Sequence, residues 1–170
     1  MTTTTPEPAP VLCCGDIGRP VIEDFAARYR LQCHWVAPGD VIPGSFWGAP
    51  EAGLIGDGLY LRDDTPVHSA LHEGCHYVCM DSARRAALHT DAAGDFAEED
   101  AVCYLQVLLA DALGVGRARL LQDMDAWGYS FRLGSARAWF DSDASEARQW
   151  LLDRGLIGQD DRPTWALRAG

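Results

Sequence analysis

The sequence predicts an α+β fold that is mostly α-helical, with a small sheet before the first strong helix. Two long segments with clear helix starts and two short apolar segments ahead of them lead to this prediction. The chain has 170 residues, of which 48% are hydrophobic, values typical of one globular domain with a substantial core. We therefore expect a single domain over residues 13–170, preceded by a disordered Thr- and Pro-rich tail over residues 1–12.

The first half of the chain predicts one helix and the small sheet. A helix is expected over residues 20–30, where apolar residues recur every four positions. A short strand is expected over residues 31–36, and a strand or hairpin over residues 54–61. The segment between them, 38–53, contains glycines and prolines at a density typical of a loop.

Two strong helices follow the predicted sheet. The first is expected over residues 67–80, because Asp64 or Thr65 can cap its start and Pro66 suits the first helical position. The second is expected over residues 96–113, and two or three further helices should follow it.

Charge and composition exclude several classes of function. The net charge of −11 argues against binding to nucleic acid or to an anionic membrane, since both need Lys and Arg. All 14 basic residues are Arg, so chemistry that needs a lysine, such as Schiff-base formation, is excluded. No apolar run is long enough to span a bilayer and no secretion signal is recognisable, so we expect a cytoplasmic protein.

The most specific motif lies in the first strong helix. His72-Glu73-Gly74-Cys75-His76 spells HExxH. Residues four apart lie on one helix face, so two imidazoles can bind one metal ion, and the intervening Glu can take a proton from water. The simpler interpretation is a helix with polar residues on its solvent face.

Neighbouring residues leave two alternatives open. His68 lies one turn before His72 and could pair with it, but that pairing leaves Glu73 and His76 without a role; a place in the pocket wall is the more ordinary interpretation. Cys75 and Cys79 could form a structural zinc site with one of the motif histidines, and Glu73 has no role in that site either.

A third metal ligand is expected from the second strong helix. Glu98 is aligned with the apolar face of that helix, and a carboxylate directed at the core needs a cation. Glu99 is the next candidate, because the stripe in line with it is less apolar. Asp95-x-x-Glu98 is also a capping-box pattern, in which Glu98 would only bind a backbone amide.

These residues resemble the gluzincin metallopeptidases, and most closely the ImmA/IrrE-type group. In those proteins a strand, a short turn and an HExxH helix precede a Glu-x-x-Ala helix; here Leu59-Tyr60-Leu61 precedes the motif, and Glu98-Glu99-Asp100-Ala101 follows it. The resemblance covers residues 54–113, about a third of the chain.

The resemblance implies a zincin-like core. Zinc (Zn2+) would be bound by His72, His76 and Glu98, with Glu73 as the general base that hydrolyses an amide bond of a peptide or protein substrate. Gluzincins commonly carry Asp or Asn four residues after the ligating Glu, where this sequence has Val102. The alternative function is a non-catalytic, zincin-like zinc-binding module that serves structure or partner recognition.

Other residues are candidates for contact with a substrate. His89 and Tyr129 could stabilise an oxyanion, although a surface His and a packed Tyr are the simpler interpretations. Arg132 and Arg137 could bind a substrate carboxylate or only offset nearby acids. The aromatic segment 43–48 could line a cleft above the metal or serve only as a connecting loop.

Overall fold

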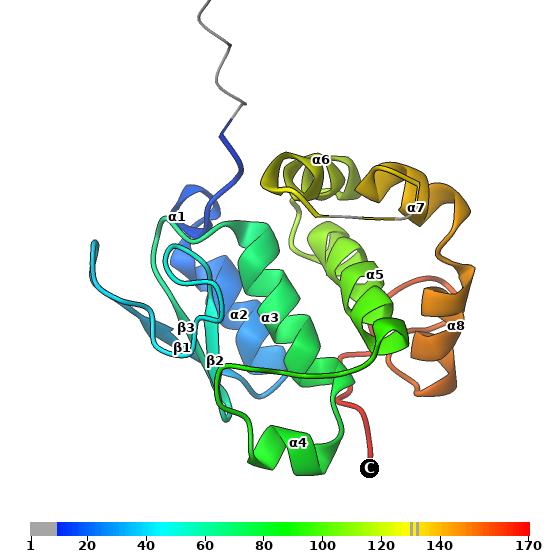
Figure 1. Ribbon diagram of the computed structural model, residues 1–170, viewed down its shortest axis with the longest axis horizontal. Helices are drawn as coiled ribbons and strands as arrows, with labels where there is room; N and C mark the ends of the chain where they lie inside the picture. Colours follow the sequence, from blue (N-terminus) through cyan, green and yellow to red (C-terminus); the bar gives the residue numbers. More distant parts are fainter. Residues whose placement is uncertain (1–9, 130, 132) are drawn as a thin grey trace, which may run out of the picture.

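The computed structural model describes residues 10–129, 131 and 133–170 and has an α+β architecture in which helices predominate (Figure 1). Most of the expected tail, residues 1–9, lies outside the described residues. Leu12, at the end of that expected tail, is attached to the domain. Its N–H donates to Asp123 Oδ2 at 2.9 Å, and its carbonyl accepts from the N–H of Val67 at 2.8 Å.

A three-stranded sheet forms one side of the molecule (Figure 1). Its strands are β1 (Gln32–Trp35), β2 (Gly53–Ile55) and β3 (Gly58–Leu61), in the order β1-β3-β2. β1 is parallel to β3, whereas β2 and β3 form an antiparallel hairpin. The small sheet expected before the first strong helix is confirmed.

Two helices precede the sheet, and the second of them packs against β1. They are α1 (Cys14–Ile17) and α2 (Arg19–Arg28), and α2 confirms the helix expected over residues 20–30. Phe25 of α2 is buried and packs against the next helix at Gly74, where an added Cβ would lie 2.5 Å from the Phe25 ring. The glycine inside the HExxH motif therefore admits an aromatic ring from α2.

The centre of the molecule consists of α3 (Val67–Cys79) packed along α5 (Phe96–Ala112), with the short α4 (Ser82–Ala86) between them in sequence (Figure 1). The expected start of α3 is wrong in detail, because Pro66 itself is the N-cap and no side chain caps the helix. The Thr65 hydroxyl instead accepts from the N–H of Arg62.

The far side of α5 is covered by α6 (Arg117–Trp127), α7 (Ala136–Ser142) and α8 (Ser145–Asp153), within the two or three further helices expected (Figure 1). The C-terminal segment then returns to α3, where the N–H of Arg168 donates to the carbonyl of Val78. Across the described residues, none of the helices combines the length and the apolar character that a membrane span requires.

Candidate metal centre

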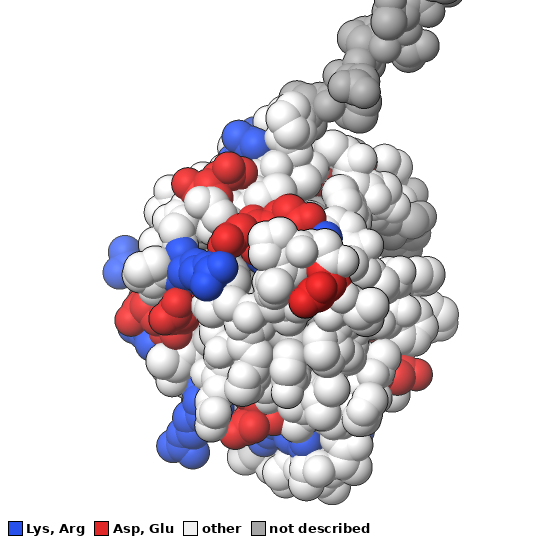
Figure 2. All heavy atoms as spheres, turned by 90° about the vertical axis from the view of Figure 1, so that its left-hand side faces the viewer, with Lys and Arg blue, Asp and Glu red and all other residues white. Residues whose placement is uncertain are grey.

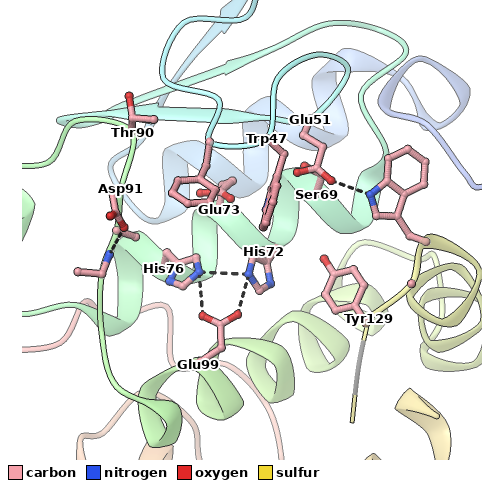
Figure 3. Close-up of a pocket in the computed structure, with 15 residues that line it drawn as sticks. Trp47, Glu51, Ser69, His72, Glu73, His76, Thr90, Asp91, Glu99 and Tyr129 are labelled. Carbon is pink, nitrogen blue, oxygen red and sulfur yellow. Dashed lines mark hydrogen bonds and ion pairs between the residues drawn. The ribbon is translucent and has the colours of Figure 1, made fainter. Parts of the chain in front are cut away.

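The HExxH helix brings two imidazole rings to one point, and α5 brings a carboxylate to the same point. The Nε2 atoms of His72 and His76 lie 3.1 Å apart. Oε1 of Glu99 lies 3.1 Å from His72 Nε2, and Oε2 lies 3.2 Å from His76 Nε2 (Figure 3). This group of two nitrogen donors and one carboxylate could hold a metal ion.

Glu99 occupies the position for which Glu98 was our first choice. The Glu98 carboxylate points away from the histidines and is bound by two guanidinium groups, from Arg84 at 2.7 and 2.8 Å and from Arg168 at 3.1 Å. The expectation that a buried carboxylate at this position needs a cation holds, but the cation is arginine. Asp95 caps the helix as expected, accepting from the N–H of Glu98 at 2.8 Å.

Gln106 orients the ring of His72 from behind. Its Nε2 donates to the carbonyl of His68 at 2.7 Å, which leaves Oε1 to accept from His72 Nδ1 at 3.1 Å. A proton on Nδ1 makes the Nε2 lone pair available to a metal ion at the cluster, as a metal ligand requires. Gln106 therefore supports His72 from behind, while Nδ1 of His76 is buried without a partner among the described residues.

The close contacts between the three groups change their acidity. Burial alone would raise the pKa of Glu99, but hydrogen bonds from His72 and His76 outweigh it and hold that pKa well below its usual range. Burial alone would lower the pKa of His72, yet its polar neighbours, including Tyr129, Cys103 and Glu99, outweigh it and raise that pKa. Without an ion, the cluster thus stabilises a negative carboxylate beside a protonated His72, and a bound cation would take the place of that positive charge.

The three residues line one side of a pocket of about 520 Å³. Glu73 lines the same pocket, and no hydrogen bond or ion pair holds its carboxylate within the described part of the chain. Burial raises the pKa of Glu73, although the nearby His72 and His76 act in the opposite direction. The loop 43–48 contributes Phe46 and Trp47 to the wall, as the cleft interpretation of that segment anticipated.

Of the other candidates Tyr129, His68 and His89, only Tyr129 lines the pocket. Tyr129 lines the pocket, with its ring centroid 5.6 Å from that of His72, and burial raises its pKa to about 12. His68 is buried behind the pocket, where its Nδ1 lies 3.2 Å from the Tyr129 hydroxyl. His89 is exposed, pairs with the Thr90 hydroxyl and is not part of the pocket wall.

The remaining candidates do not join the cluster. Arg137 lies 3.7 Å from Asp141 on the exposed face of α7, and Arg132 lies outside the described residues. Cys75 and Cys79 are fully buried among apolar side chains, and the metal-capable group found among the described residues contains neither of them. The structure therefore does not assemble the alternative Cys/His site.

Sequence reasoning missed Gln106 and Glu51. Gln106 carried a usable signal, because it is a polar residue inside the apolar stretch of α5, seven positions after Glu99 and hence two turns along the same face. Glu51 carried none, because it lies in a loop and reaches the pocket only through the tertiary fold.

Comparison with known proteins adds no relative. No protein-family model, curated protein or solved structure matches this chain.

Proposed function

We propose that this protein is a zinc-dependent hydrolase of amide bonds in peptides or proteins, with His72, His76 and Glu99 as the metal ligands. The observation that carries the proposal is the convergence of three donor atoms at the edge of a pocket. A donor set of two imidazoles and one carboxylate that leaves a position open toward a pocket is typical of catalytic zinc. In its ligand types and HExxH spacing, the site resembles those of gluzincins.

The spacing of the donor atoms supports a single ion. Zinc bonds to nitrogen and oxygen of about 2.0–2.2 Å in a tetrahedral arrangement place neighbouring ligands about 3.3 Å apart. The three contacts here measure 3.1, 3.1 and 3.2 Å. The two Glu99 contacts use different oxygens, but one nitrogen of each histidine and one oxygen of Glu99 all lie within 4.8 Å of one another, so modest side-chain movements bring them to the spacing of one ion.

The pocket residues fit defined roles in hydrolysis. When bound, zinc supplies a Lewis acid that polarises a carbonyl group and acidifies water. Glu73, with a raised pKa and a carboxylate that no described residue holds by a hydrogen bond or ion pair, takes the proton from the attacking water and passes it to the leaving amine. Tyr129 stays protonated because its pKa is raised to about 12, so its hydroxyl can donate to the oxyanion.

A non-catalytic metal-binding module is the competing function. A structural zinc site is closed by a fourth protein ligand, as a rule Cys or His. Among the described residues the metal-capable group has three members, and they face a pocket rather than the packed core. This openness favours an enzyme over a structural site.

Two measurements test the proposal. The first is the metal content of the purified chain by mass spectrometry, compared with a His72→Ala/His76→Ala double variant. We expect about one zinc per chain, lost in the double variant, and absence of metal even with zinc supplied would overturn the site.

The second measurement follows cleavage of a peptide mixture by the wild type, by Glu73→Gln and by the matched surface variant Glu146→Gln. The Glu73→Gln variant should keep its metal and lose cleavage, whereas Glu146→Gln should retain both. A wild-type protein that binds zinc but cleaves nothing would favour the non-catalytic module. Unchanged cleavage by Glu73→Gln would remove the role assigned to Glu73.

A further inference from the structure

The pocket beside the metal ligands is strongly acidic. Four carboxylates line it, those of Glu51, Glu73, Asp91 and Glu99, and no arginine occurs among its described lining residues. Glu99 contacts the two histidines, but the other three form no ion pair within the described part of the chain. The pocket therefore concentrates negative charge that the protein itself does not balance.

Several acids elsewhere on the surface are paired with arginine. On the face shown in Figure 2, acidic and basic side chains lie next to one another. Arg19 lies 2.9 Å from Asp63, and Arg62 lies 2.7 Å from Asp64. The carboxylates of Asp63 and Asp64 are thus neutralised by arginine, whereas the carboxylates of the pocket are not.

A metal ion does not remove the excess charge. Four ionised carboxylates carry −4, and a divalent ion at His72, His76 and Glu99 adds +2, so the pocket keeps −2. Protonation of Glu73 would still leave −1. This step rests on the proposed function, because it places the ion and the substrate in the same pocket.

The walls of the pocket are aromatic as well as acidic. Trp47 is 77% exposed, and its side chain points into the pocket toward the metal-binding residues (Figure 3). Trp127 lies on the pocket wall, and its indole Nε1 donates to Glu51 Oε1 at 2.6 Å. Exposed indole faces attract cations and large apolar groups, and the fixed carboxylate beside them selects the cation.

Elsewhere in the chain, a carboxylate–indole pair lies beside a guanidinium group whose ion pair is with another carboxylate, Asp63. On α2 and β1, the indole Nε1 of Trp35 donates to Glu23 at 3.1 Å, and the guanidinium carbon of Arg19 lies 4.8 Å from the centre of the Trp35 ring. The Glu51–Trp127 pair repeats this carboxylate–indole arrangement at the pocket. There, no arginine of the described chain covers the Trp127 ring.

We propose that the pocket recognises a positively charged side chain of the substrate, arginine or lysine, held by Glu51 and the rings of Trp47 and Trp127 next to the bond that is cleaved. The carboxylate and the indole faces provide charge and stacking at once, a combination that suits guanidinium best. Substrates are then peptides with a basic residue beside the scissile amide.

The test compares two nearly isosteric ligands by calorimetric titration of the full chain. Nα-acetyl-arginine amide carries the charge, and Nα-acetyl-citrulline amide replaces the guanidinium with a neutral urea group. We expect the arginine ligand to bind about tenfold more tightly, as one charge-assisted contact in a partly enclosed site provides. Equal binding of the two ligands, or no binding of either, would overturn the proposal.

Two matched variants locate the preference. Glu51→Gln keeps an oxygen that can accept from Trp127 and removes the charge, so it should abolish the preference for arginine. Glu23→Gln makes the same change at the pair on α2 and β1, away from the pocket, and should leave the preference intact. A preference that survives Glu51→Gln would show that the cation binds elsewhere.

The titration separates this inference from the proposed function. It measures binding without turnover, and it can be repeated on the His72→Ala/His76→Ala variant, in which the metal ligands are removed. A preference for arginine in that variant supports the cation site whether or not the wild type binds zinc. Zinc binding and hydrolysis by the wild type with no preference for arginine would overturn only the cation site.

Discussion

Replacing Gln106 by leucine should weaken metal binding while the protein stays folded. Gln106 is fully buried, and its Oε1 lies 3.1 Å from Nδ1 of His72. Leucine has a similar size but cannot accept a hydrogen bond, so the ring loses the contact that fixes its tautomer. Loss of such a contact behind a metal ligand typically lowers metal affinity 10–100-fold, or about 1.4–2.8 kcal/mol.

The cost in stability should be smaller than the cost in affinity. The His72 side chain is 15% exposed, so water can reach part of the ring after the substitution. We expect the metal-free variant to lose about 1 kcal/mol of unfolding free energy, the low end of the range for an unsatisfied buried polar group.

The assay is a zinc titration in competition with a chelator of known affinity, alongside urea unfolding of the metal-free proteins. Gln149→Leu is the matched control, because Gln149 is exposed on α8 and bonds only Asp153 among the described residues. The control should bind zinc like the wild type. Wild-type affinity in a folded Gln106→Leu variant would refute the role of Gln106 in orienting His72.

Three further predictions concern stability. Gly74→Ala should destabilise the protein by about 1 kcal/mol in urea unfolding, because contact with the Phe25 ring at 2.5 Å outweighs the gain in helix propensity; a more stable variant would contradict this. Glu98→Gln should lower the free energy of unfolding by about 3 kcal/mol, because it leaves two arginines without their carboxylate, but it should not affect zinc binding. Glu99→Gln should abolish zinc binding. The reverse pattern would restore Glu98 as the ligand. Burial lowers the pKa of His68 from 6.5 to about 3, so the unfolded chain binds more protons than the folded chain at intermediate pH. The free energy of unfolding should therefore fall by about 1.5 kcal/mol from pH 6.5 to pH 5 because of this residue. An equal fall in the His68→Phe variant would contradict this prediction.

The secondary structure was accessible from the sequence wherever its cause is local. The Asp95 cap and the spacing of apolar residues were enough to locate α5 to within one residue at its end. The start of α3 was misjudged because its first N–H is satisfied by the carbonyl of Leu12, a residue far away in the sequence. Local patterns cannot reveal a partner that only the fold brings close.

The candidate site likewise has one part that local geometry predicts and one part that only the fold determines. His72 and His76 share a helix face by their spacing alone, so their convergence followed from helical geometry. The choice between Glu98 and Glu99 depended on arginines 14 and 70 residues away from Glu98, which satisfy it before any metal does. The physical argument that a buried carboxylate needs a cation was sound, but the sequence could not identify that cation.

Because the candidate site is built on α3 and α5, removal of a bound metal ion should not unfold the protein. The two helices hold each other through fully buried apolar residues, among them Leu71, Val78, Val102, Leu105 and Leu109. Unlike a zinc finger, whose chain unfolds without its ion, this scaffold does not depend on metal for its core. Protein stripped by a chelator should therefore stay folded and recover on re-addition of zinc, with occupancy set by the free metal in its surroundings.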